Sequence, residues 1–275
     1  MYSNKLFVFI FSFFLAACST PLLDSQKITQ LGTVIDLKNN QEISVSELIS
    51  RLSHQDYILI GEEHDQKVHH QLEQYILEQI DHARPLDSVV FEMLNVSQQQ
   101  SITQTQSQLK NANSISESEI KQSIQWTKWD WNMYKDLIIN RLKSPNKVIA
   151  ANLTQSEVNT ILNGAEPLKG NRSISQEVQD KIAQLMHSVS HANLSDINKM
   201  IMVQQFRDRR MAEKLFKTSQ KPTALIAGNH HVRKDIGVPI HLADYGINNN
   251  ISVLMIMSQQ ENITSTEADY IWLIK

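Results

Sequence analysis

In two places of the sequence, a histidine stands three residues after a glycine. Each of these glycines comes directly after a short apolar run. Gly61-Glu62-Glu63-His64 follows Tyr57-Ile58-Leu59-Ile60, and Gly228-Asn229-His230-His231 follows Thr223-Ala224-Leu225-Ile226-Ala227. Runs of this length and β-branched content predict buried strands, and glycine lets the backbone turn sharply where a strand ends. A single histidine is usually a surface or satisfied core residue. The repeated offset is therefore the informative observation.

Other polar side chains are also predicted at strand ends. Glu92 follows the apolar run Ser88–Phe91, and Asn152 follows the run 147–151. If these strands are parallel, their carboxyl ends share one edge of the sheet, where ligands of open α/β proteins bind. For the first histidine stretch a simpler interpretation also stays open, in which Asp65 caps a helix and the neighbouring glutamates are solvated.

Histidines and glutamates along one edge have the composition of a metal site or of an acid–base centre. The candidate catalytic residues are Glu62, His64, Glu92 and His231. The candidate ligands of a divalent metal are Glu62, Glu63, His64, Glu92, His230 and His231. The same composition also suits polar anchoring of a ligand. The sequence has no Gly-x-Ser-x-Gly motif, so an enzyme built here would be a hydrolase that acts through activated water.

Alternation of strands and helices predicts an α/β fold with a mostly parallel sheet flanked by helices. Residues 165–217 contain no convincing strand and read as two long helices, Ser175–Ser190 and Ser195–Lys217. We therefore expect a smaller all-helical subdomain, residues 165–217, inserted into an α/β domain made of residues 31–164 and 218–275.

An aromatic cluster and a group of methionines each allow two interpretations. Trp126, Trp129, Trp131 and Tyr134 lie within nine residues of each other, and four methionines fall in residues 186–211. The aromatic side chains would form either core or the wall of a flat apolar pocket. The methionines would form either an adaptable binding face or ordinary helix packing.

The N-terminal segment has the features of a secretory signal. A short apolar run after Lys5 ends in Leu15-Ala16-Ala17-Cys18 and is too short for an ordinary membrane span. The Leu-Ala-Ala-Cys ending resembles the bacterial lipobox, which implies a signal peptide of residues 1–17, lipidation of Cys18 and a tether of residues 18–30. Ser19 implies sorting to the outer membrane of a Gram-negative bacterium, facing the periplasm. An incidental cysteine in a plain signal peptide is the alternative.

Composition limits the other classes of function. The chain has 275 residues, a net charge of −3 and no basic run, which makes nucleic acid an unsuitable partner. Cys18 is the single cysteine, so no disulfide can form within the chain and the fold must rest on a packed core.

Taken together, these motifs resemble the ChaN-like haem-binding lipoproteins over nearly all of the mature chain. The matching segments are the lipobox, Ile58–Asp65, His69-His70, Val89–Met93, Trp129–Trp131 with Tyr134, Ile149–Leu153, Arg207–Ala212, Ala227–Arg233 and Gly237–Leu242. One departure is Thr154-Gln155, where the family pattern has Pro and Arg. If that arginine holds a carboxylate in the family, this chain must supply the charge elsewhere.

The resemblance implies a membrane-anchored protein that binds haem for haem or iron uptake. It further implies that haem lies at the interface of a homodimer, with an outer-membrane haem receptor as a candidate partner. Tyrosine is the axial ligand expected from the family, and Tyr134 and Tyr245 lie next to family motifs. Arg207 and Arg233 are the candidate cations for the propionates, and His241 is a further cofactor-binding candidate.

Two other functions stay open. The paired Gly-x-x-His pattern is distantly similar to that of Tiki-type metalloproteases and erythromycin esterases, in which histidine and glutamate carry hydrolysis. A metal-dependent peptidase or esterase is therefore the alternative function. A structural or interaction lipoprotein without a working site is the third.

Overall fold

The computed structural model describes residues 25–111, 115–189, 194–218 and 220–275. The predicted signal peptide, Cys18 and most of the predicted tether lie outside the described residues. Within these ranges, no helix is both long enough and apolar enough to cross a membrane.

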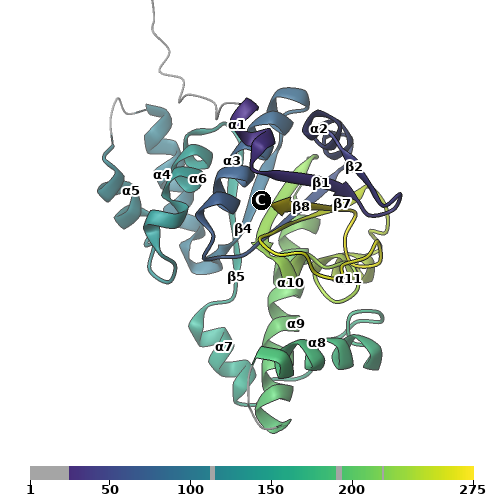
Figure 1. The fold of residues 1–275 in the computed structure, drawn as a ribbon. Helices are drawn as coiled ribbons and strands as arrows, with labels where there is room; N and C mark the ends of the chain where they lie inside the picture. The colour runs from purple at the N-terminus through teal and green to yellow at the C-terminus, as the bar shows by residue number, and fades with distance from the viewer. Residues whose placement is uncertain (1–24, 112–114, 190–193, 219) are drawn as a thin grey trace, which may run out of the picture.

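An eight-stranded, mostly parallel sheet lies at the centre of the described part of the chain (Figure 1). Its strands are β1 (Gly32–Asp36), β2 (Gln41–Ile43), β3 (Tyr57–Glu62), β4 (Ser88–Asn95), β5 (Lys147–Asn152), β6 (Thr223–Gly228), β7 (Ile251–Met257) and β8 (Tyr270–Ile274). Their spatial order is β2-β1-β8-β7-β3-β6-β4-β5. All neighbours from β8 to β5 are parallel, whereas β1 pairs antiparallel with both β2 and β8. The predicted α/β class with a mostly parallel sheet is confirmed.

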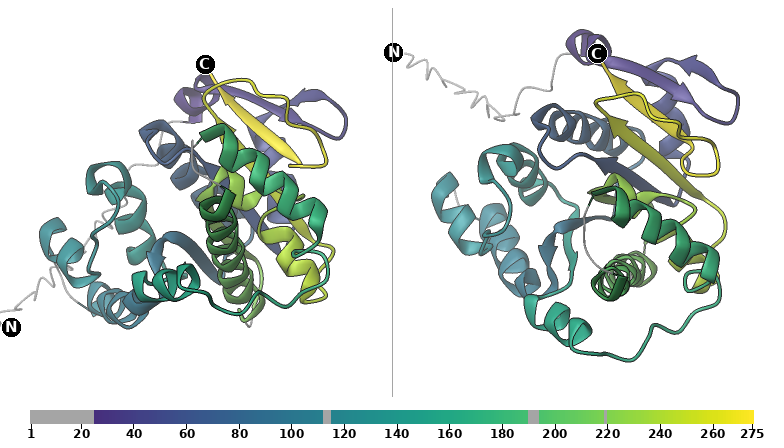
Figure 2. Two further views of the ribbon diagram at one scale, coloured as in Figure 1. Left: turned by 90° about the horizontal axis from the view of Figure 1, so that it is seen from below. Right: turned by 60° about the horizontal axis from the view of Figure 1, so that its bottom comes forward.

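Helices cover both faces of the sheet (Figure 2). They are α1 (Ser25–Gln30), α2 (Val45–Ser53), α3 (Lys67–Ala83), α4 (Gln99–Asn111), α5 (Glu117–Ser123), α6 (Trp131–Lys143), α7 (Gln155–Leu162), α8 (Gln176–Val189), α9 (Leu194–Phe216), α10 (Asn229–Val232) and α11 (Val238–Asp244). Successive residues of a strand point to opposite faces. Ile58 and Ile60 therefore pack with α2, α3 and α6, whereas Leu59 packs with α9 and α11. Every residue of β3 is buried, as expected for a parallel strand covered on both sides.

Several helix starts follow from local sequence. Ser44 caps α2 by accepting a hydrogen bond from the Glu47 amide. Thr154 and Glu157 form the capping box that begins α7. Helix α3 begins at Lys67 after Gln66, so the alternative interpretation in which Asp65 caps this helix is wrong.

The long helix α9 belongs to two packing environments. Met211, Ala212 and Leu215 in its C-terminal part are fully buried against strand residues on one face of the sheet. Nearer its N-terminus, Ile197 and Ile201 pack instead with α8 in a separate apolar cluster. The division of the chain into an α/β domain and a helical subdomain stays a prediction.

The three strands that carry most of the predicted rim are neighbours. β6 lies between β3 and β4, and the pairing places Glu62 opposite Gly228. The register between β4 and β5 shifts between Phe91 and Asn95, the stretch of β4 that contains Glu92. β1 is not an edge strand, because β2 pairs along its outer side.

Candidate functional site

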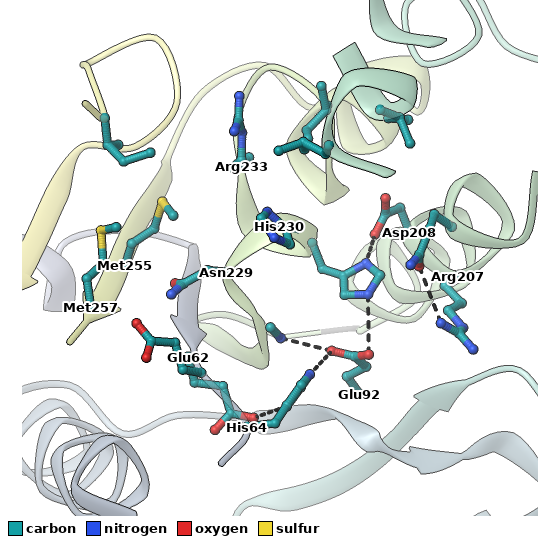
Figure 3. Close-up of a pocket in the computed structure, with 18 of the residues that line it drawn as sticks. Glu62, His64, Glu92, Arg207, Asp208, Asn229, His230, Arg233, Met255 and Met257 are labelled. Atoms are coloured by element: carbon teal, nitrogen blue, oxygen red, sulfur yellow. Dashed lines mark hydrogen bonds and ion pairs between the residues drawn. The ribbon is translucent and has the colours of Figure 1, made fainter. Parts of the chain in front are cut away.

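A cavity of about 520 Å³ opens at the carboxyl ends of β3, β4, β6 and β7 (Figure 3). Its polar lining comes from Glu62, Glu63, His64, Glu92, Gln204, Arg207, Asp208, Asn229, His230, His231, Arg233 and Glu261. Its other lining residues are Trp129, Ile182, Leu185, Met186, Gly228, Ile236, Met255, Met257 and Ile263. The cavity thus has an acid–histidine floor and an apolar wall contributed largely by α8 and β7.

Glu62 is the centre of the first polar cluster on the floor. Its Oε1 accepts hydrogen bonds from Tyr134 Oη at 2.6 Å and from His64 Nδ1 at 2.6 Å. Although burial by itself raises the pKa of Glu62, the hydrogen bonds of His64 and His70 lower it to about 2. The carboxylate is therefore ionised near neutral pH, and it holds the His64 ring through Nδ1.

A second layer lies beneath that carboxylate. His70 Nδ1 is 2.6 Å from Glu62 Oε2 and 3.2 Å from Glu73 Oε2. Although burial alone lowers the pKa of His70, its two carboxylate partners raise it to about 10. Burial, aided by the charge of Glu62, raises the pKa of Glu73 well above its ordinary value. Near neutral pH the layer therefore combines a protonated His70 with an ionised Glu62, and the raised pKa of Glu73 favours its neutral form.

Glu92 joins the two Gly-x-x-His stretches. Its Oε2 accepts the Gly228 amide at 2.9 Å and lies 3.8 Å from His64 Nε2, while its Oε1 lies 3.3 Å from His231 Nε2. His231 Nδ1 is 2.5 Å from Asp208 Oδ1. Burial opposes these charges, but the His231 charge lowers the pKa of Glu92 to about 2. Glu92 and Asp208 together raise the pKa of His231 to about 10 against the effect of its burial, and burial raises the pKa of Asp208 to about 6.

Glycine is required where the two stretches meet. A Cβ atom at Gly228 would lie 2.9 Å from His64 Nε2. At Gly61, a Cβ atom would lie 2.4 Å from Asn229 Oδ1 and 2.5 Å from Val232. The matching glycines thus let α10 and the His64 ring approach the strand ends closely.

The structure brings all six predicted metal ligands to the cavity lining, together with both arginines. The cofactor-binding candidates Tyr134, Tyr245 and His241 do not line it. Tyr134 is buried beneath the floor. Tyr245 stacks on Phe216 with ring centroids 4.9 Å apart, and His241 Nδ1 accepts a hydrogen bond from Arg209. Asn152 of the predicted rim lines a different, much smaller pocket.

Sequence reasoning missed three residues of the site. His70 and Glu73 lie three positions apart on α3, a spacing that puts both on the helix face towards Glu62. Asp208 comes from the middle of α9, far along the chain from its partner His231. The helical spacing was a usable signal for the first two, whereas only the tertiary fold reveals Asp208.

The aromatic cluster serves both of the roles that the sequence left open. Trp126 and Trp131 are buried in the core with Tyr134. Trp129 reaches the cavity, and its ring centroid lies 4.4 Å from that of His64. One of the three tryptophans is thus part of the cavity wall.

The residues best placed to bind a metal differ from the predicted ligands, and only Glu62 belongs to both sets. Among the described residues, only Glu62, His70 and Glu73 bring ligand atoms from three side chains within 4.8 Å of one another. Glu73 Oε1 is buried there without a hydrogen-bond partner. These donors suit a divalent ion chemically, but the raised pKa values of His70 and Glu73 mean that the ion would compete with protons for them.

His230 and Arg207 offer the cavity polar groups with few partners. The His230 side chain is exposed towards the cavity, and partial desolvation with the nearby His231 and Arg233 charges lowers its pKa, which favours neutral imidazole. Arg207 Nε is buried without a hydrogen-bond partner, and its guanidinium contacts Gln204 at 3.4 Å. Arg233, in contrast, is engaged by Asp235 and Glu267.

The sequence and the fold are both similar to those of known haem-binding proteins. The sequence model of a family described as haem-binding uptake, Tiki superfamily, ChaN matches residues 48–242. A solved structure described as cofacial haem binding to ChaN of Campylobacter jejuni superposes with a TM-score of 0.81, at 29% identity over 90% of this chain and 98% of that chain. Among curated proteins, none matches the sequence.

More distant structures share less of the fold. An erythromycin esterase mutant in its open conformation gives a TM-score of 0.49 at 10% identity, covering 88% of this chain and 82% of that chain. The type III effector HopBA1 gives 0.47 at 11% identity, covering 82% and 89%.

Proposed function

Because this chain belongs to the ChaN family of the Tiki superfamily, we propose that it binds haem in the cavity at the carboxyl edge of its sheet. The observation that carries the proposal is the cavity itself. Its volume of about 520 Å³ falls within the range of small-molecule and cofactor sites. Its wall of isoleucine, leucine, methionine and tryptophan suits an apolar macrocycle. The Campylobacter relative, described as binding haem cofacially, supports the same ligand.

The cations of the cavity fit the propionates of haem unequally. Arg207 lines the cavity and forms no ion pair with a carboxylate among the described residues, so a propionate would pair with it without displacing another anion. Arg233 already pairs with two carboxylates. Arg207 is therefore the better candidate for propionate recognition. Arg233 instead neutralises the charges of Asp235 and Glu267.

The sequence also supports a proposal for the cellular role. The lipobox at Cys18 and the short apolar run before it support a lipid anchor in the outer membrane, with the site facing the periplasm. A haem-binding protein held there is suited to haem or iron uptake, with an outer-membrane haem receptor as a natural partner. The cofacial arrangement described for the Campylobacter relative supports a homodimer as the haem-bound unit.

The direct test is titration of the purified full chain with ferric haem, followed by visible spectroscopy and size-exclusion chromatography. We expect a Soret shift at micromolar haem and elution as a dimer. Arg207→Ala should weaken haem binding more than Arg233→Ala. The absence of a Soret shift in the wild type would reject the proposal.

A second candidate function rests on the partners of His64. Its Nδ1 is held by an ionised carboxylate, while its Nε2 lies 3.8 Å from a second one, Glu92 Oε2. A ring fixed in this way suits a general base that activates water. The third candidate, an interaction lipoprotein without a working site, has no such support. A panel of peptide and ester substrates, assayed with wild type and His64→Asn after metal analysis, tests hydrolysis. Equal turnover by both proteins would exclude His64 as the base.

A further inference from the structure

We propose that Asp244, the last residue of α11, is a positioning residue that acts on the cavity from a distance. Together with Arg209 of α9 it forms a clamp, the set of hydrogen bonds that these two side chains make to residues 169–173, and the clamp holds α8 against the cavity. The inference rests on the proposed haem function and adds a residue on which that function depends. Neither Asp244 nor Arg209 is among the residues that line the cavity, so neither is expected to touch the ligand.

A segment without helix or strand, residues 163–175, connects α7 to α8. It is visible in Figure 2 as the long teal stretch that leads into the green helix α8. Because such a segment lacks the regular hydrogen bonds of a helix or a sheet, its backbone groups need partners elsewhere. The groups that fix its last residues also fix where α8 begins, at Gln176.

The carboxylate of Asp244 accepts four hydrogen bonds. Its Oδ1 accepts the backbone amides of Asn171 at 3.2 Å and Arg172 at 2.9 Å. Its Oδ2 accepts the Ser173 hydroxyl at 2.5 Å and Arg209 Nη2 at 2.8 Å. Burial raises the pKa of Asp244, but the hydrogen bonds from Ser173 and the two amides bring it below its ordinary value. The group is therefore ionised near neutral pH, and hydrogen bonds to an ionised acceptor are stronger than those between neutral groups.

Arg209 holds the same segment from α9. Its Nη1 donates to the backbone carbonyl of Lys169 at 2.9 Å, and its Nη2 also donates to the Ser173 hydroxyl at 2.9 Å. A Cβ atom on Gly170 would lie 2.4 Å from Asp244 Oδ2 and 2.7 Å from Arg209 Nη2, so glycine is needed for the backbone to come this close. The clamp thus gives residues 169–173 one defined position relative to α9 and α11.

Helix α8 depends on the clamp because it packs outside the two core clusters of the sheet. Its buried contacts form a small separate cluster with α9 and the loop after α10, made of Val178, Ile182, Ile197, Ile201 and Ile236. Lys181 adds a partly exposed ion pair with Asp235 at 3.5 Å. Ile182, Leu185 and Met186 of this helix nevertheless line the cavity. A shift of α8 would therefore open the apolar wall while leaving the sheet intact.

The test compares Asp244→Asn with Asp180→Asn, the same chemical change at an exposed position of α8. The amide offers one oxygen where the carboxylate offers two, so the backbone amides of α8 should exchange hydrogen faster in haem-free Asp244→Asn, while those of β3 and β6 stay unchanged. Haem should leave this variant about 2- to 30-fold faster, the range for substitutions that alter a site without contacting its ligand. Transfer of haem to excess apomyoglobin measures that rate. The visible spectrum of the bound haem should stay that of the wild type, and Asp180→Asn should match the wild type throughout.

If Asp244→Asn does not fold, Ser173→Ala removes only the hydroxyl between Asp244 and Arg209 and should change the same quantities in the same direction. Equal exchange of α8 in Asp244→Asn and Asp180→Asn, or faster exchange spread over the whole protein, would overturn the clamp. Faster exchange of α8 with unchanged haem dissociation would overturn its role for the cavity. A wild type that binds no haem would reject the proposed function, whereas the exchange measurement, made without haem, would still decide whether the clamp holds α8.

Discussion

The hydroxyl of Tyr134 donates a hydrogen bond of 2.6 Å to Oε1 of Glu62, and both side chains are buried. Burial, reinforced by the Glu62 charge, raises the pKa of Tyr134 far above its ordinary value. A tyrosinate ligand would have to form next to an ionised carboxylate. This relationship therefore assigns Tyr134 to the support of Glu62 and, through it, of His64.

Replacing Tyr134 by phenylalanine should lower stability and spare haem binding. The change removes one donor from a buried carboxylate, which costs about 1–3 kcal/mol in the free energy of unfolding. Urea denaturation measures this loss. Tyr245→Phe is the matched control, because the Tyr245 hydroxyl has no hydrogen bond within the described residues, and it should change the free energy little. A haem spectrum altered by Tyr134→Phe alone would contradict the supporting role.

Glu92→Gln should be among the most destabilising single changes at the site. The carboxylate pairs with His231 and accepts the Gly228 amide, and it is almost fully buried. The change removes one of the two carboxylates that face the buried His231 charge, and loss of a partner from a buried ion pair costs roughly 3–5 kcal/mol. Denaturant unfolding checks the value, with Glu42→Gln on the exposed face of β2 as control. Equal losses for the two variants would show that the Glu92 charge is not needed for folding.

The free energy of unfolding should depend on pH through the protonation of His231. Its pKa is about 10 in the folded protein against 6.5 ordinarily, so its contribution is fully present below pH 6.5 and is lost as pH rises towards 10. Across that window the wild type should lose up to about 1.4 kcal/mol per pH unit from this group. His231→Gln should lack this component. Unfolding curves of both proteins at several pH values give the difference, and parallel curves would contradict the raised pKa.

The sequence predicted the parts of the site that depend on strand ends. β3 and β6 are apolar runs ended by glycine, and their parallel pairing brings Glu62 and Gly228 into register, as two matching stretches suggested. Asp208 and Glu73 could not be placed in the same way, because their partners depend on how α9 and α3 pack over the sheet. The local sequence pattern predicts the type of an element and where it ends. The packing of helices on the sheet determines which helical side chains reach the cavity.

Lipidation of Cys18 is testable apart from the cavity. Cys18→Ser should abolish incorporation of labelled palmitate, because the thiol is the only acceptor that the lipobox offers. Ser19→Ala keeps the cysteine and should be labelled like wild type. Membrane fractionation of the same cells should release Cys18→Ser, since stable anchoring requires more than one acyl chain. Equal labelling of the serine variant and the wild type would reject the anchor.

The close approach of Gly228 to His64 gives the sharpest test of the floor. Gly228 has a φ of −58°, which alanine adopts freely, so any cost of Gly228→Ala must come from the added Cβ atom. That atom would meet His64 Nε2 at 2.9 Å. Overpacking of this kind costs typically about 1–3 kcal/mol.

The double variant His64→Ala/Gly228→Ala separates this contact from a general effect of alanine. With the imidazole removed, the Cβ atom no longer meets Nε2, so Gly228→Ala should cost much less in that background than in the wild type. The four free energies of unfolding form a double-mutant cycle, and we expect a coupling of about 0.5–3 kcal/mol for residues in direct contact. Additive costs would mean that His64 does not sit over the end of β6. The Glu92 bridge between the two histidine stretches would then have to be abandoned.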